Sequence, residues 1–137
     1  MKKRVDIESP FMGKSEDLET KTKETQRNIK YARCCVRDSL MRGEAPYASH
    51  LLYTQPGILD DNIPEERTFG IDAGLELIKE FDLTAVYIDL GISRGMKYAI
   101  EKANKEGRKI EERTLGENWE EEYNKRVGNH SHNGLFA

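Results

Sequence analysis

The sequence is poor in cysteine and has no long hydrophobic run. Its two cysteines, Cys34 and Cys35, are adjacent within a helical pattern, where neighbouring side chains point about 100° apart. A disulfide between them would be strained, and neither a CxxC pair nor the spacing of zinc ligands is present. We therefore expect small core residues and no metal or other cofactor.

No apolar run approaches the length of a membrane span. The basic N-terminus, Met1-Lys2-Lys3-Arg4, is not followed by the apolar segment of a signal peptide. These features favour a cytoplasmic protein that does not bind membranes.

The chain also lacks an excess of positive charge. Among its 137 residues, 22 are Lys or Arg and 25 are Asp or Glu, which gives a formal net charge of -3. Duplex nucleic acid is bound by clustered, uncompensated cations, so the composition argues against a protein that binds duplexes. The length suits one domain with its own core.

Apolar segments and helical patterns alternate along the chain. Strands are expected near 4–8, 45–49, 84–89 and 109–113, helices near 25–41, 62–80 and 94–106, and a mobile loop or frayed helix start over 14–24. This order is typical of a parallel sheet with helices on both faces. We predict a three-layer, Rossmann-like (flavodoxin-like) α/β domain with a mostly parallel sheet of four to five strands over residues 1–113. An acidic helix and a polar tail follow over 114–137.

The helix expected over 62–80 contains Gly70 and Gly74, four residues apart. Glycine lowers helix propensity, so another segment, or a second subunit, should pack closely against that side.

The segment 88–99 is the most informative one. An apolar strand ends at Asp89, a turn containing Gly91 and Ser93 follows, and then a helix begins. This arrangement aims a carboxylate, a hydroxyl and free backbone N–H groups at one point, where a phosphate or a sugar fits. Ser93 is equally a favoured helix N-cap residue. Ser9 and His50 follow two other strands, so all three polar positions should share the edge of the sheet at which ligands bind.

These segments, over residues 5–113, resemble the nucleoside 2-deoxyribosyltransferase-like superfamily, which includes deoxynucleoside 5′-monophosphate N-glycosidases. They also resemble an uncharacterised branch of it found in phage and Gram-positive genomes. Ser9-Pro10-Phe11, with Gly13, is similar to the family's opening loop, which implies contacts with a base and a sugar. Ser49-His50 resembles a polar position where the enzymes often place a histidine, and Asp82 resembles the family's acid at a helix-to-strand junction.

The run Ser93-Arg94-Gly95-Met96-Lys97-Tyr98-Ala99 resembles the pattern Ser-x-Gly-x-x-Tyr-Glu that closes the family's phosphate and sugar site. Its last position departs from the family, because Ala99 stands where the enzymes carry a glutamate. In glycosidic chemistry such a carboxylate attacks or stabilises the anomeric carbon. Glu101 lies two positions further, about 200° around the helix. Asp89 is therefore the leading candidate for a catalytic carboxylate.

Three classes of function stay open. The first is a nucleotide- or nucleoside-binding pseudoenzyme that senses or sequesters a nucleotide signal, as a phage sponge against host defence does. The second is an N-glycosidase or deoxyribosyltransferase that uses Asp89 or another relocated carboxylate, with Asp60, Asp61 and Asp72 as further acids near the edge. The third is a structural protein whose pocket is unused.

The resemblance also implies a homo-oligomer, a dimer or larger, in which a neighbour completes the pocket. The candidate ligand-binding residues are Ser9, Pro10, Phe11, Gly13, His50, Asp89, Ser93, Arg94 and Gly95.

Overall fold

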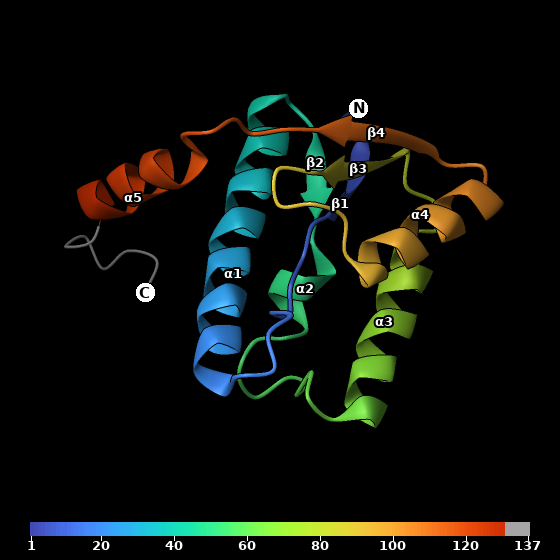
Figure 1. Ribbon diagram of the computed structural model, residues 1–137. Helices are drawn as coiled ribbons and strands as arrows, with labels where there is room; N and C mark the ends of the chain where they lie inside the picture. Colours follow the sequence, from blue (N-terminus) through green and yellow to red (C-terminus); the bar gives the residue numbers. More distant parts are fainter. Residues whose placement is uncertain (131–137) are drawn as a thin grey trace.

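The structure, a computed structural model, describes residues 1–130 of the chain (Figure 1). Its elements in chain order are β1 (Arg4–Glu8), α1 (Leu18–Met41), β2 (Ala45–Tyr47), α2 (Ser49–Leu52), α3 (Pro64–Ile78), β3 (Leu83–Tyr87), α4 (Arg94–Lys105), β4 (Lys109–Arg113) and α5 (Trp119–His130).

The strands form one parallel sheet of four strands in the order β2-β1-β3-β4. The predicted α/β, Rossmann-like fold is confirmed. Helix α1 covers one face of the sheet, and α3 and α4 lie on the other side (Figure 1). Strand β2 lies on one side of β1, and β3 and β4 lie on the other. The direction in which the chain adds strands to the sheet therefore reverses between β1 and β3. In sheets of this kind, a ligand binds outside the carboxyl ends of the strands at such a point.

Two helix starts refine the sequence prediction. Helix α1 begins at Leu18, inside the segment expected to be a mobile loop or a frayed helix start, because the Asp17 side chain caps it by accepting a hydrogen bond from the Thr20 N–H at 2.9 Å. Helix α3, expected from about residue 62, begins at Pro64 with Ile63 as its N-cap residue, and Pro64 occupies the first turn, where its missing N–H has no cost.

The two faces of the central strands carry different side chains. On the α1 face, Val5, Ile7 and Tyr87 pack with Tyr31 and Cys35 in an apolar core. Cys34 and Cys35 are both buried and free, as expected of core residues.

The opposite face of the same strands is polar. Asp6 and Thr84 are buried there, together with Arg108, which precedes β4. The Arg108 Nε donates to Thr84 Oγ1 at 2.8 Å, and the Thr84 hydroxyl donates to Asp6 Oδ2 at 3.3 Å. Both faces of an interior parallel strand are covered, which explains why Asp6 is not solvated.

The glycines of α3 pack within the molecule. A Cβ atom at Gly74 would lie 3.3 Å from Ser49 Cβ, and one at Gly70 would lie 3.1 Å from Leu59 Cδ1. The predicted close packing is confirmed, with α2 and the loop that follows it as the partner.

Helix α5 docks against α1. Trp119 makes an edge-to-face contact with Tyr31 at a centroid distance of 5.0 Å, and the Arg33 guanidinium donates to the Tyr123 hydroxyl at 3.0 Å. Within residues 1–130, no helix combines the length and the apolar character needed to cross a membrane.

A buried ion pair joins the end of β4 to the start of β2, and we predict that breaking it destabilises the fold. The Arg113 guanidinium donates to both Glu44 oxygens at 2.7 and 2.8 Å, and its side chain is 3% exposed. Glu44→Ala removes both of these hydrogen bonds and leaves Arg113 with Glu111, at 2.6 Å, as its remaining ion-pair partner, so we expect the free energy of unfolding to fall by about 2 kcal/mol. Thermal and urea unfolding measure the loss, with Glu112→Ala on exposed β4 surface as the control. Equal stability of the two variants would contradict a structural role for the pair.

The same pair makes stability depend on pH. The hydrogen bonds from Arg113 lower the pKa of Glu44. A carboxylate with a lowered pKa stabilises the fold above its unfolded-state pKa and loses that contribution as the pH falls through its folded-state pKa. The difference between wild type and Glu44→Ala should therefore shrink in acid.

Candidate functional site

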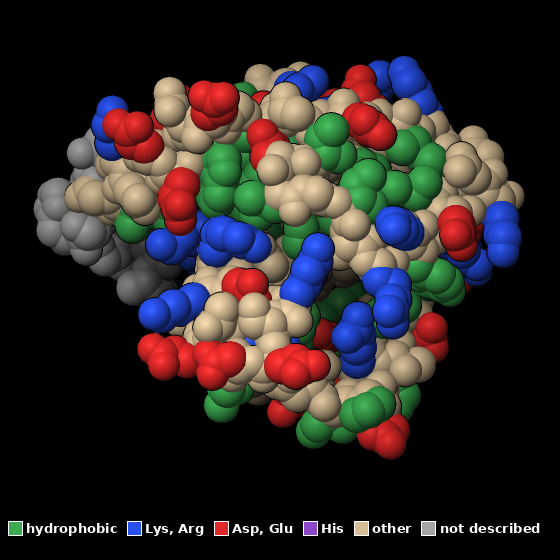
Figure 2. Space-filling model, in the orientation of Figure 1, with side chains coloured by type: hydrophobic (Ala, Val, Ile, Leu, Met, Phe, Trp, Pro, Cys, Tyr) green, Lys and Arg blue, Asp and Glu red, His purple; other side chains and the backbone are tan. Residues whose placement is uncertain are grey.

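A cavity of about 730 Å³ opens at the carboxyl ends of the strands. Its walls come from the β1–α1 loop, α1, α2, α3 and the beginning of α4. Figure 2 shows the hollow, with Lys and Arg side chains along its rim. Eight of the nine candidate residues line it, namely Ser9, Pro10, Phe11, Gly13, His50, Ser93, Arg94 and Gly95.

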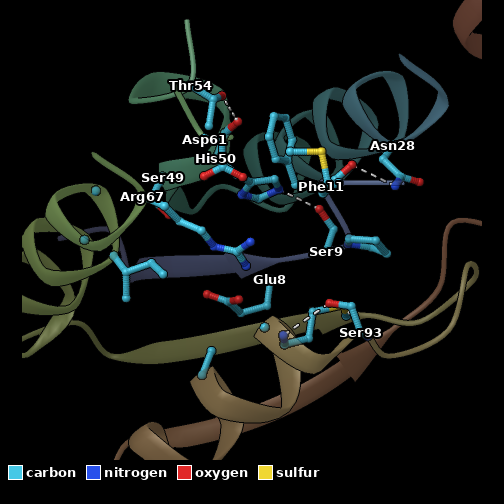
Figure 3. Close-up of a pocket in the computed structure, with 18 of the residues that line it drawn as sticks. Glu8, Ser9, Phe11, Asn28, Ser49, His50, Thr54, Asp61, Arg67 and Ser93 are labelled. Atoms are coloured by element: carbon cyan, nitrogen blue, oxygen red, sulfur yellow. Dashed lines mark hydrogen bonds between the residues drawn. The ribbon is translucent and has the colours of Figure 1, made fainter. Parts of the chain in front are cut away.

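Ser9 and His50 form a hydrogen-bonded pair in this cavity. The Ser9 Oγ lies 2.8 Å from the His50 Nε2 (Figure 3). Burial lowers the pKa of His50 to about 4, so the imidazole is neutral at pH 7. The Phe11 ring meets the His50 ring edge-on at a centroid distance of 6.3 Å. One wall therefore offers an aromatic side chain beside uncharged hydrogen-bonding groups.

The loop that carries these residues is fixed to α1. The Asn28 side chain, 2% exposed, donates to the Phe11 carbonyl at 2.9 Å, and Thr25 Oγ1 accepts from the Gly13 N–H at 2.9 Å. A Cβ atom at Gly13 would lie 2.4 Å from the Lys21 carbonyl oxygen. Gly13 thus has a packing role, because only glycine lets the loop approach α1 so closely.

The N-terminus of α4 forms the opposite wall. Ser93 is the N-cap residue and its hydroxyl accepts from the Met96 N–H at 3.3 Å. The first N–H groups of a helix have no intrahelical partner, so those of Arg94 and Gly95 can still bind an anion. Ala99 lines the same cavity and carries no acid.

Asp89 does not line the cavity. Its carboxylate accepts hydrogen bonds from the Tyr31 hydroxyl at 2.5 Å and from the N–H groups of Leu115 and Gly116, at 2.9 to 3.0 Å. Although partial burial acts in the opposite direction, these hydrogen bonds lower the pKa of Asp89. The side chain ties the β3–α4 turn to α1 and to the segment before α5. This geometry disfavours the catalytic role expected of Asp89.

The other predicted acids are distributed around the molecule. Asp82 lies at the amino end of β3, where it accepts a hydrogen bond from the Arg4 N–H at 2.9 Å. It therefore lies at the end of the sheet opposite to the cavity. Asp61 lines the cavity, whereas Asp60 and Asp72 do not. In the described part of the chain, no group of three His, Cys, Asp or Glu side chains is placed to hold a metal ion.

The bottom of the cavity holds two acids that are not among the candidate residues predicted from the sequence. Asp6 and Glu8, two residues apart on β1, both line it. Burial raises the pKa of both groups. For Glu8, the neighbouring Asp6 charge and a hydrogen bond between the two carboxyl groups add to the increase, opposed by Arg108. The titrations of the two acids are therefore coupled, and both acids release their protons at a higher pH than ordinary carboxyl groups do.

Cations surround the mouth. Lys14, Arg27, Arg67 and Arg94 line the cavity. Among residues 1–130, no ion pair joins any of them to a carboxylate. Arg67 extends from α3 into the cavity towards Glu8 (Figure 3). Unpaired guanidinium groups beside a helix N-terminus suit a phosphate.

We predict that Asp89→Asn lowers stability without affecting ligand binding in the cavity. The amide keeps one acceptor but loses the charge that the Tyr31 hydroxyl and the two N–H groups solvate. Differential scanning calorimetry should show a lower Tm, and the loss should be smaller at a pH below the lowered pKa of Asp89. A variant with unchanged Tm but lost ligand binding would return Asp89 to the site.

A solved structure of a 2-deoxyribosyltransferase from the psychrotolerant bacterium Bacillus psychrosaccharolyticus superposes with a TM-score of 0.55 over 88% of this chain and 90% of that chain, at 19% sequence identity. The chain thus has a 2-deoxyribosyltransferase-like fold, as the resemblance implied. No curated protein matches it.

A protein-family model matches residues 3–113, which is most of the chain. The chain therefore belongs to the family described as Domain of unknown function (DUF7768).

Proposed function

We propose that the protein binds a nucleoside or nucleotide in the cavity at the ends of β1 and β3. One observation carries this proposal: the same cavity combines an aromatic side chain, Phe11, with the open N-terminus of α4 on its far wall. The first can stack on a base and the second can bind a phosphate. The likeness to a 2-deoxyribosyltransferase supports the choice of a nucleoside-type ligand.

The size and the charges of the cavity agree with this ligand. Sites for small molecules measure roughly 300 to 1,000 Å³, and this one measures about 730 Å³. The unpaired cations at its mouth favour an anionic group there. A phosphorylated ligand would therefore place its phosphate at the mouth and its uncharged parts further inside.

In our primary proposal, the ligand is held without being cleaved. Ala99 presents a methyl group where the resemblance implies a carboxylate, and Asp89 is engaged outside the cavity. Such a protein would sense or sequester a nucleotide signal in the cytoplasm, in the manner of a phage sponge.

A second candidate is an N-glycosidase or deoxyribosyltransferase with a relocated acid. One observation favours it, namely that the Glu8 carboxyl group lies inside the cavity. Burial raises the pKa of Glu8, and a carboxylic acid with a raised pKa is suited to general acid catalysis. Glu8 then replaces Asp89 as the leading candidate for the acid.

Incubation with nucleotides separates the two candidates. The purified protein is mixed with nucleosides, deoxynucleotides, NAD, ADP-ribose and cyclic nucleotides, and the free fraction is analysed by liquid chromatography before and after heat denaturation. We expect a compound that leaves the free fraction and returns unchanged on heating. Free base that accumulates with time, and is lost in Glu8→Gln, would establish the enzyme instead. Absence of both would contradict the proposed function.

We also propose that the protein is a homo-oligomer that associates through the outer side of α3 and α4. Phe69 and Leu77 on α3 and Tyr98 on α4 are 66%, 50% and 53% exposed. Apolar side chains exposed on neighbouring helices favour association. We expect light scattering after gel filtration to report at least a dimer, and Phe69→Glu to shift it to the monomer mass. A wild-type monomer at high concentration would contradict this assignment.

A further inference from the structure

The acid pair at the bottom of the cavity is built to accept hydrogen bonds from a ligand. Asp6 is 2% exposed and lies beneath Glu8, against the Thr84 hydroxyl and the Arg108 guanidinium. Asp6 and Glu8 are two residues apart on β1, so their side chains lie on the same face of the strand, and both line the cavity. The Glu8 carboxyl group extends into the cavity (Figure 3), where its oxygens can accept hydrogen bonds.

The chemistry of this pair selects the ligand group that it can meet. Two neighbouring carboxyl groups present oxygen atoms that carry negative charge, which repel a phosphate. A hydroxyl or an amine donates to a carboxyl oxygen without that cost. A carboxyl oxygen that loses its hydrogen bonds to water when a ligand fills the cavity needs a replacement donor. The ligand that binds best therefore supplies a hydrogen-bond donor to Glu8.

The position of Glu8 identifies which part of the ligand supplies the donor. Figure 3 shows the Arg67 guanidinium and the Ser9–His50 pair on one side of its carboxyl group, and Ser93, the N-cap residue of α4, on the other. In the proposed function, on which this step rests, the first side holds the base and the second the phosphate. The sugar of a nucleotide connects the two. An acid at the end of a strand that hydrogen-bonds ribose hydroxyls is also the solution used by dinucleotide-binding sheets.

We propose that Glu8, beside Asp6, binds the sugar hydroxyls of the ligand, and that the cavity therefore prefers ribonucleotides to 2′-deoxyribonucleotides. The ligand class that follows is a ribonucleoside with a phosphate group, although the similar solved structure is that of a 2-deoxyribosyltransferase. A site built to accept a hydrogen bond discriminates against the analogue that lacks the donor, because its own polar group is then left unpaired.

The test compares matched pairs of ligands. Isothermal titration calorimetry at constant salt measures the Kd of AMP against dAMP and of UMP against dUMP. We expect the ribonucleotide of a pair to bind at least about 10-fold more tightly, as one hydrogen bond to a carboxyl group implies. Equal affinities within both pairs would overturn the inference and leave the proposed function intact. Failure of all four nucleotides and of the matching nucleosides to bind would overturn both.

Variants assign the preference to Glu8. Glu8→Ala should bring the ratio of the two Kd values close to one, mainly by weakening the ribonucleotide. The control Glu112→Ala, an exposed glutamate on β4 outside the cavity, should keep the wild-type ratio. A ratio that survives Glu8→Ala would overturn the assignment. Thermal unfolding shows whether Glu8→Ala folds. If it does not, the comparison of ligand pairs on the wild-type protein still tests whether the cavity prefers ribonucleotides.

Discussion

The site depends on one constraint, the placement of two acids on the interior strand β1. A parallel strand in the middle of a sheet is covered on both faces, so Asp6 is buried, whereas Glu8, at the end of the strand, is partly exposed where it lines the cavity. The Arg108–Thr84–Asp6 chain of hydrogen bonds stabilises the lower acid, and Asp6 in turn stabilises a proton on Glu8. The same chain connects β1 to β3 and to the segment before β4, so the polar face also joins the elements that surround the cavity.

Much of the fold follows from local pattern. The strand Lys109–Arg113 and the start of α4 at Arg94 lie where the sequence places them, because a β-strand period and a Ser N-cap are local signals. The grouping of Ser9, His50 and Ser93 at one edge follows from parallel topology alone. The sequence leaves open whether 14–24 is a loop or a helix start, because the hydrophilic stretch before Thr25 has no apolar stripe, and the cap formed by Asp17 decides for the helix.

The two failures within the site have a common physical origin. Sequence shows where a residue lies along a strand, but not which way it points after the strand ends. Strand β3 ends at Tyr87, so the turn that follows is free to direct Asp89 towards Tyr31 and Leu115. Glu8 was interpreted as one of the charged residues of an alternating strand. The signal that could have identified it is its position on an interior strand, where both faces are buried and an acid needs a partner.

The family pattern that the sequence resembles ends in a glutamate. This chain has Ala99 at that position and carries Glu8 elsewhere in the cavity. Ala99 of α4 and Glu8 of β1 line the same cavity, so a carboxyl group is still present but lies on a different wall. Glycosyl transfer needs a carboxylate at the anomeric carbon, whereas recognition of a sugar needs only an acceptor near its hydroxyls. This difference is why Ala99 supports the proposal that the protein holds a nucleotide without cleaving it.

The most direct test of this account is the ionisation of Glu8, followed by ¹³C NMR of its side-chain carboxyl group with and without AMP. We predict that the free protein keeps Glu8 protonated well above the ordinary pKa of a glutamic acid, and that AMP shifts its resonance together with those of Ser9 and Gly95. A Glu8 that titrates in the ordinary range and does not respond to AMP would contradict the account.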